Sequence, residues 1–242
     1  MPFTYDYPRP GLTVDTVILG FDAVDGVLRV LMIRRRNDPF KDHWAIPGGF
    51  VHVSDRGRQG ETIEAAARRE LAEETGIRVA YLEQLYTFGA PGRDPRGRVV
   101  SVAYLALVRQ SDHTPRAGSD AAEARWFTIA EALDTALAFD HREMLELAVE
   151  RVRGKVRYSP IGFNLLPERF TIGQLHRFYV ALLGREIDPA NFAKKVDREL
   201  VRAGIVVKTD QVQKGQHRPA PLYRFDKRAY DKAARGGFNF EI

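Results

Sequence analysis

The sequence predicts an α/β domain with a mixed sheet and helices on both faces, followed by a winged helix-turn-helix domain. Strand-like and helical segments alternate through residues 1–155, whereas residues 156–242 contain two short helices and then a hairpin. Charge divides at the same place: residues 156–242 carry 16 Lys and Arg against 9 Asp and Glu, and residues 1–155 carry 21 against 23. An acidic-to-neutral first half joined to a basic second half suggests two separate functions, although a basic surface often serves only solubility.

The first domain, residues 1–155, begins with two strands. Residues 12–21 alternate in hydrophobicity, and residues 27–33 follow the turn signal Asp25-Gly26. We expect further strands at residues 80–88, 99–108 and 125–127, and helices at residues 130–137 and 141–156. A loop dense in Gly, Pro and Arg, residues 89–98, lies between two of these strands.

The second domain, residues 156–242, starts at a helix-breaking segment, residues 158–162. Thr171 is a capping residue for a helix over residues 172–183, and Asp188 for a helix over residues 189–203. Strands are expected at residues 205–209 and 222–225, joined by a polar, basic loop. Two helices and a hairpin in this order are typical of a winged helix. The alternative is a helical dimerisation module with solvated lysines.

The most informative segment runs from Gly48 to Ile77. It begins with a glycine pair and ends in a helix on which Glu70, Glu73 and Glu74 share one face, where like charges repel. A divalent cation converts this repulsion into ligation, and oxygen ligands suit Mg²⁺ or Mn²⁺. We therefore expect the three glutamates to bind the ion, with a backbone carbonyl of Gly49 close to it. The alternative is a solvated acidic face.

Neighbouring residues make this motif more specific. Glu61 lies eight residues before Arg69, about two helical turns, so the two side chains can meet and orient the ligand carboxylates. Gly76 follows the acidic turn, where the end of a helix favours a residue that tolerates the left-handed conformation. The motif therefore contains a supported metal site and a defined helix end.

From Glu61 to Ile77 the sequence resembles the Nudix box, whose form is Gly, five residues, Glu, seven residues, then Arg-Glu-aliphatic-x-Glu-Glu-x-Gly-aliphatic. The resemblance implies a Nudix α/β/α sandwich and metal-dependent hydrolysis of a nucleoside diphosphate linked to another group. It makes Arg69, Glu70, Glu73 and Glu74 the catalytic candidates, and which glutamate is the base stays open. One departure concerns spacing, because eleven residues separate Gly49 from Glu61. We expect a polar bulge within residues 53–59, which favours metal binding over efficient hydrolysis.

Nearly the whole chain resembles the Nudix-related transcriptional regulators (NrtR). The matching segments are Phe170–Leu175, Asp188–Phe192, Arg218–Tyr223, and Tyr81–Phe88 with Arg93–Arg96. The resemblance implies a homodimer that binds ADP-ribose or a related nucleotide and the operators of genes for NAD metabolism. Many members have a degraded Nudix box, whereas this chain keeps its residues. The leading hypothesis is a DNA-binding regulator that senses ADP-ribose, and the alternative is a Mg²⁺-dependent ADP-ribose pyrophosphatase with an accessory C-terminal domain.

The resemblance also directs attention to nucleotide and DNA contacts. Candidate ligand-binding residues are Arg93, Arg96, Arg98 and Phe88. Solvated loop arginines and a core phenylalanine are the alternatives, and His141 can simply cap the helix that it begins. Candidate DNA-binding residues on the second helix and the wing are Asn191, Lys194, Lys195, Arg198, Lys214 and Arg218.

Other features restrict the class of protein. The chain contains no cysteine, which excludes disulfides, thiolate zinc sites and a cysteine nucleophile. Residues 1–10 do not resemble a secretory signal, and no apolar run reaches the length of a membrane span. A cytoplasmic protein without a membrane partner is the expectation.

Overall fold

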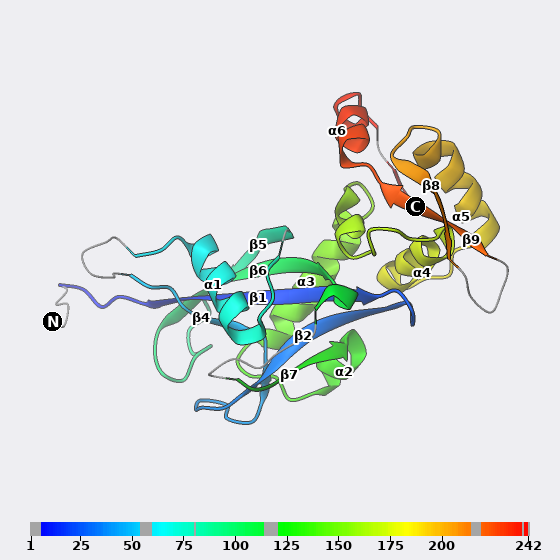
Figure 1. Ribbon diagram of the computed structural model, residues 1–242. Coiled ribbons are helices and arrows are strands. Elements are labelled where there is room, and N and C mark those ends of the chain that lie inside the picture. Colours follow the sequence, from blue (N-terminus) through cyan, green and yellow to red (C-terminus); the bar gives the residue numbers. More distant parts are fainter. Residues whose placement is uncertain are drawn as a thin grey trace. The chain divides into compact units, whose positions relative to one another are not determined.

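A seven-stranded sheet organises the N-terminal part of the chain. The computed structural model describes residues 6–53, 60–79, 81–113, 121–213, 219–238 and 240–241. The main path of paired strands is β3 (Trp44–Ala45), β2 (Val27–Arg35), β1 (Gly11–Asp22), β6 (Val99–Arg109) and β5 (Tyr81–Phe88) (Figure 1). In addition, β4 (Gly48–Phe50) pairs with β1, and β7 (Ala121–Thr128) pairs with β2.

The expected strands of the first domain are confirmed to within about two residues at four positions, β1, β2, β5 and β6. The strand expected at residues 125–127 is longer in the structure, because β7 pairs with most of β2. The helix expected at residues 130–137 is α2 (Ile129–Asp134), which ends earlier than expected. The helix expected at residues 141–156 is α3 (His141–Lys155). The capping residue of α2, Thr128, forms a capping box with Glu131, so the start of α2 is locally determined.

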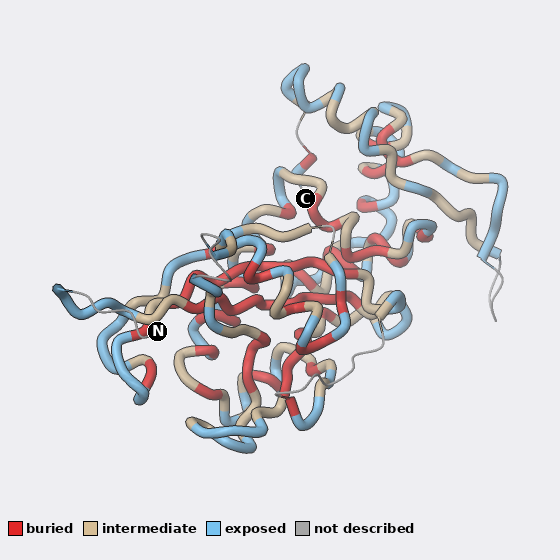
Figure 2. Tube along the Cα trace, turned by 60° about the vertical axis from the view of Figure 1, so that its left-hand side comes forward, coloured by how far each residue is buried: buried red, intermediate tan, exposed pale blue. Residues whose placement is uncertain are grey.

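Helix α1 (Ile63–Thr75) covers part of the sheet. The hydroxyl of Thr62 caps its first turn, and Gly76 ends it with a φ of 73°. Ala66 and Ala67 pack against Val14 of β1 and neighbouring residues of β6. These small residues let the helix lie close to the sheet, which brings its acidic turn to β4. Figure 2 shows buried residues concentrated in the central strands, which include β1 and β6.

The C-terminal part contains the expected helix-turn-helix and hairpin. Its elements are η2 (Pro160–Asn164), α4 (Ile172–Leu183), α5 (Pro189–Val196), a π-helical continuation η3 (Asp197–Val201), β8 (Val206–Gln213), β9 (Ala220–Phe225) and α6 (Lys227–Arg235). Thr171 and Gln174 form a capping box at α4, and Asp188 caps α5. The apolar face of α4 is buried through Leu175, Phe178, Tyr179 and Leu182. Helix α6 was not predicted.

The chain divides into two compact units. The first contains residues 1–19, 29–107 and 113–148, and the second contains residues 149–242 together with residues 20–28 and 108–112. The tip of the β1–β2 hairpin therefore belongs to the second unit. Within that unit the ring of Phe21 meets the ring of Phe178 edge-on, with centroids 5.2 Å apart. None of the helices in the described part of the chain is long and apolar enough to cross a membrane.

Candidate functional site

A cavity of about 380 Å³ opens in the first unit, between β1, β2, β4, α1 and the loops that follow β5 and α2. One wall is acidic and contains Asp15, Glu70 and Glu74. Another is basic and contains Arg35, Arg36, Arg93 and Arg96. An acidic wall can hold a cation and a basic wall can hold an anion, so the cavity suits a phosphorylated ligand that binds together with a metal ion.

The acidic wall depends on a close approach between β4 and the last turns of α1. Glu74 is buried, and its Oε2 accepts a hydrogen bond of 2.8 Å from the backbone N–H of Gly48. A Cβ atom on Gly49 would lie 2.2 Å from Oε1 of Glu70. No larger residue fits there without displacing this carboxylate. The glycine pair therefore brings β4 into contact with the carboxylates of α1.

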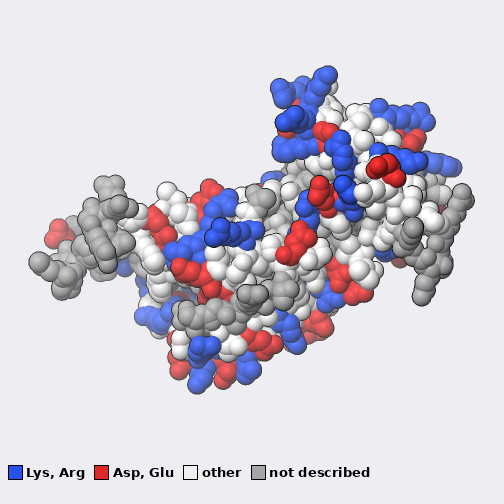
Figure 3. All heavy atoms as spheres, viewed as in Figure 1, with Lys and Arg blue, Asp and Glu red and all other residues white. Residues whose placement is uncertain are grey.

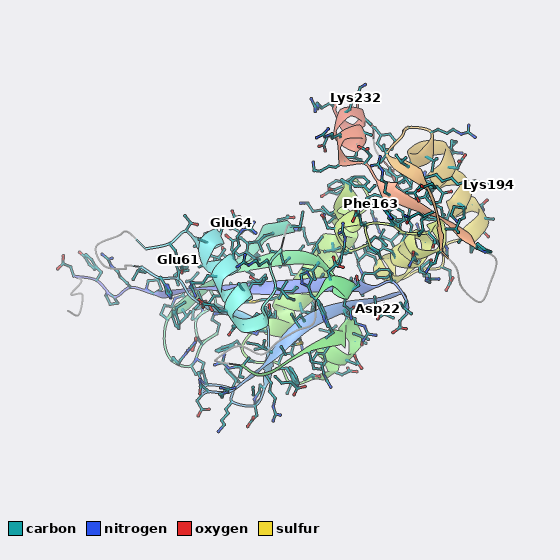
Figure 4. All side chains as sticks on the ribbon, viewed as in Figure 1. Asp22, Glu61, Glu64, Phe163, Lys194 and Lys232 are labelled. Carbon is teal, nitrogen blue, oxygen red and sulfur yellow. The ribbon has the colours of Figure 1, made fainter. Side chains whose placement is uncertain are left out.

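Arg69 holds three glutamates of the motif. Its Nε and one terminal nitrogen donate to Glu61 at 3.1 and 2.6 Å, and its other terminal nitrogen donates to Glu70 at 2.8 Å and to Glu73 at 3.2 Å. These hydrogen bonds lower the pKa of Glu61, which stays ionised. Burial raises the pKa of Glu70, although Arg69 acts in the opposite direction. Figure 4 marks Glu61 beside α1.

The structure brings two of the three expected metal ligands to the cavity. Glu70 and Glu74 line it, whereas the side chain of Glu73 is 60% exposed and its carboxylate bonds to Arg69. Within the described ranges no three His, Asp or Glu side chains are arranged so that they could hold one ion. The carboxylates of half-buried Glu70 and buried Glu74 nevertheless fit a hard divalent cation, because its charge would relieve the cost of removing theirs from water.

His141 has a different position from the simple helix cap of the alternative interpretation. It is buried, and its Nδ1 accepts a hydrogen bond of 2.9 Å from the backbone N–H of Ile46. The proton of the neutral ring is therefore on Nε2, which lies 3.6 Å from Oδ1 of Asp15. Burial lowers the pKa of His141 and keeps the ring neutral. Asp15 also accepts a hydrogen bond from Ser101, so its carboxylate is held in place.

The predicted arginines have two environments. Arg93 is almost fully buried and donates two hydrogen bonds to Asp140, at 2.8 and 2.6 Å. Arg96 lines the same cavity, and Asp94 accepts hydrogen bonds from its Nε and a terminal nitrogen at 2.7 to 3.2 Å. Arg98 is exposed and is not among the lining residues, and neither is Phe88, whose ring meets Tyr86. The structure therefore brings Arg93 and Arg96 to the cavity, but not Arg98 or Phe88.

Arg35 is a cavity residue that the sequence analysis missed. Its Nε donates to the backbone carbonyl of Pro39 at 2.8 Å, and its guanidinium lies 5.0 Å from the ring centre of Phe139. Burial lowers the pKa of Arg35, and the nearby charge of Arg96 adds to this effect. Among the described residues no carboxylate lies within ion-pair distance of Arg35, so an anionic ligand group would offset this repulsion.

Asp15 was also missed, although a signal was present in the sequence. Asp15 lies in β1, where the neighbouring residues from Val14 to Leu19 are buried and mostly apolar. A charged residue in the middle of a buried strand is expected to have a partner or a function. Phe139 also lines the cavity but carries no signal in the sequence. Its left-handed backbone conformation, with a φ of 51°, is visible only in the folded chain.

The second unit carries the predicted nucleic-acid surface on α5. Asn191 and Lys194 on α5, and Arg198 on the following segment η3, are exposed and stand three and four residues apart in the chain. Lys195 is half-buried, lies 5.6 Å from the ring centre of Phe240 and bonds to a glutamate. Lys194 is marked on α5 in Figure 4. The two wing candidates, Lys214 and Arg218, lie outside the described residues.

Basic side chains are frequent over this unit. Figure 3 shows Lys and Arg gathered around α6, the helix after the hairpin. The exposed cations of α6 include Arg228, Lys232 and Arg235. The excess of positive charge seen in the sequence of residues 156–242 is therefore at the surface, where it can meet a polyanion.

Comparison with known proteins assigns both parts of the chain. Residues 10–148 match the NUDIX domain family, and residues 162–225 match the NrtR DNA-binding winged helix domain. The chain is 38% identical to the ADPR responsive transcriptional repressor NtrR of Acinetobacter baylyi, over 97% of this chain and 87% of the relative. It is also 39% identical to an ADP-ribose pyrophosphatase of Methanocaldococcus jannaschii, over 51% of this chain and 70% of that protein.

Solved structures extend the similarity to the fold. The crystal structure of Shewanella oneidensis NrtR complexed with a 27mer DNA has a TM-score of 0.76 and 33% identity, covering 95% of this chain and 97% of that one. The NUDIX domain of the same protein, complexed with ADP ribose, has a TM-score of 0.51 and 35% identity, covering 61% and 94%. A Nudix cavity with an intact box and a winged helix thus occur in one chain, and this protein belongs to the NrtR family of Nudix-related transcriptional regulators.

Proposed function

We propose that the protein is a transcriptional repressor of genes for NAD metabolism that senses ADP-ribose in its Nudix cavity. The observation that supports this most directly is the cavity itself, with Glu70 and Glu74 on one wall and Arg35, Arg93 and Arg96 on another. A diphosphate flanked by two riboses presents charge that both walls can neutralise, one directly and one through a metal ion. The names of the Acinetobacter and Shewanella relatives support the same ligand class.

The ion is proposed to be Mg²⁺ or Mn²⁺. Glu70, Glu74 and the backbone at Gly49 would hold it, and Glu73 would join them by turning away from Arg69. When bound, the ion supplies positive charge for the diphosphate and lowers the pKa of a coordinated water. Arg69 keeps Glu70 oriented and Glu61 keeps Arg69 in place, so these two residues position the site.

DNA binding is proposed for the winged helix domain, residues 156–242, which follows the Nudix domain, residues 1–155. Asn191 and Lys194 on α5, together with Arg198 on η3, would lie at the major groove, and Lys214 and Arg218 of the wing would meet phosphates. The protein is proposed to act as a homodimer in the cytoplasm, because a dimer can read two half-sites of one operator.

The test is an electrophoretic mobility shift with a duplex from the promoter region of the protein's own gene. The full chain should retard this duplex and release it when ADP-ribose is added. A scrambled duplex of equal length and unrelated nucleotides at the same concentration are the controls. If the promoter duplex is bound no better than the scrambled one, the protein is not a sequence-specific repressor.

A second function, ADP-ribose hydrolysis, is favoured by the intact arrangement of Glu61, Arg69 and Glu70. The similarity to the Methanocaldococcus pyrophosphatase covers this part of the chain. Chromatography of ADP-ribose incubated with the protein and Mg²⁺ or Mn²⁺ tests it. Release of AMP that is lost in a Glu70→Gln variant would establish hydrolysis, and its absence after long incubation would leave the cavity as a sensor only.

A further inference from the structure

Glu199 pairs with two of the basic residues that the sequence predicts as DNA contacts, Lys195 and Arg198. Its Oε1 accepts hydrogen bonds from Lys195 Nζ at 3.1 Å and from a terminal nitrogen of Arg198 at 2.7 Å, and its Oε2 lies 3.0 Å from Lys195 Nζ. One carboxylate thus offsets one of the two positive charges that α5 and η3 offer here. Lys194 has no such partner among the described residues.

The pairing is built into the helix. The side chain of Glu199 is only 23% exposed, and Lys195 also lies against the ring of Phe240. Burial acts against ionisation of Glu199, but the hydrogen bonds from Arg198 and Lys195 prevail and lower its pKa, so it stays charged at neutral pH. Arg198 and Glu199 belong to the π-helical segment η3, a geometry frequent at functional sites.

A phosphate that approaches α5 therefore competes with Glu199 for Lys195 and Arg198. Contacts to phosphates supply most of the sequence-independent affinity for DNA. A carboxylate beside the phosphate-binding cations therefore lowers the affinity for every duplex by about the same factor, whatever the sequence of the duplex. Contacts to bases, which Asn191 can make from the exposed side, are left to decide which duplex is bound.

We propose that Glu199 limits the sequence-independent affinity of the winged helix for DNA and so keeps the protein releasable. This inference rests on the proposed DNA-binding function. A ligand that changes operator affinity does so by a limited factor, typically about 5- to 150-fold. If phosphate contacts alone held the protein on DNA, such a factor would not free it, and the many non-specific sites of a genome would retain it.

The test compares the full chain with its Glu199→Gln variant on the promoter duplex and on a scrambled duplex, at several salt concentrations. We expect the variant to bind both duplexes more tightly, each on the order of tenfold, with a logarithmic salt slope steeper by about one. Saturating ADP-ribose should release the variant less completely than the wild type. Thermal unfolding of both proteins checks that the fold is unchanged.

Asp197→Asn is the matched control. It removes the same charge two residues away, where Asp197 pairs at 3.4 Å with Arg202, whose side chain is 73% exposed. This variant should change scrambled-duplex affinity much less than Glu199→Gln does. A second comparison introduces Glu199→Gln into a Lys195→Ala, Arg198→Ala background, where its effect should vanish because the released cations are gone.

Several results would overturn the inference. Affinity of Glu199→Gln for the scrambled duplex within twofold of wild type would mean that no competition exists. If Asp197→Asn raises the affinity as much as Glu199→Gln does, the effect comes from the overall charge of the domain and not from the pairing of Glu199. Weaker promoter binding with unchanged scrambled binding would make Glu199 a contact to a base. If the wild-type protein binds the promoter duplex and the scrambled duplex equally well, the proposed function is wrong. Even then, an increased affinity of the Glu199→Gln variant for both duplexes would remain measurable and would support the competition.

Discussion

Glu73 and Glu74 are neighbours in sequence but differ in environment. Glu74 is buried and bonds to Gly48 at the cavity, whereas Glu73 is 60% exposed and bonds to Arg69. We expect Glu74→Gln to lower Mn²⁺ affinity by about tenfold or more, comparable to losing a supporting contact of a metal site. Glu73→Gln removes the same charge from the same helix and should have a smaller effect. Isothermal titration calorimetry with Mn²⁺ measures both.

The outcome of that comparison separates two arrangements. If the two variants lose equal affinity, Glu73 turns toward the ion and all three glutamates act as ligands. If neither loses affinity, the ion does not bind at this helix. Circular dichroism of each variant verifies that the domain is folded.

Buried His141 should make stability depend on pH. Burial lowers its pKa in the folded protein, so below about pH 6.5 the unfolded chain binds a proton that the folded chain does not. The unfolding free energy should therefore fall as pH decreases, by up to about 1.4 kcal/mol per pH unit from this group. Urea unfolding between pH 7 and pH 5 measures the slope.

A His141→Gln variant should lose this part of the slope, whatever its absolute stability. His43→Gln, which removes a histidine outside the cavity, reports the effect of losing a histidine as such. Equal slopes in the wild type and in His141→Gln would show that His141 is protonated in the folded protein.

At the scale of the element, α5 should divide its contacts between phosphates and bases. Lys194 is exposed and should contact a phosphate, so Lys194→Ala should weaken all duplexes about equally and reduce the salt slope by about one. Asn191 stands near the start of the helix and suits a base edge, where its loss should cost about 1–3 kcal/mol for the promoter duplex only. Fluorescence anisotropy with two duplexes measures both.

Lys232→Ala on α6 is the charge-matched control for Lys194→Ala. Lys232 is exposed in the same unit but outside the helix-turn-helix (Figure 4). If the two lysine variants lose the same affinity, the DNA surface includes α6. If Asn191→Ala weakens promoter and scrambled duplexes alike, the base contacts come from another element.

At the scale of the whole molecule, the two binding functions should be linked. A ligand controls DNA binding only if it binds one conformation better than another. We expect ADP-ribose to lower operator affinity by about 5- to 150-fold, and operator DNA to lower ADP-ribose affinity by the same factor. Calorimetry of ADP-ribose binding in metal-free buffer, with and without saturating operator, tests this reciprocity. Equal affinities would mean that the units are merely tethered.

Much of the architecture was determined by local sequence. Thr62, Thr171 and Asp188 cap α1, α4 and α5 as their side chains and positions indicate, and glycines follow α1 and α4 in the left-handed conformation. The acidic helix and the Glu61–Arg69 pair could likewise be predicted, because one helix with its N-terminal flank contains both residues. Such features depend on residues within about ten positions of each other, so the sequence alone specifies them.

The walls of the cavity were decided only by the tertiary structure. Asp15, Arg35, Arg93 and His141 lie far apart in the chain and meet because the order of the strands brings β1 between β2 and β6. The exclusion of Phe88 at the end of β5 and of Arg98 in the following loop has the same origin, since sequence spacing does not fix which side chains face the cavity. The contact of Lys195 with the ring of Phe240 also joins distant segments, whereas its pairing with Glu199 four residues later is local. Local propensity selects the elements, whereas burial and charge pairing between distant segments select the site.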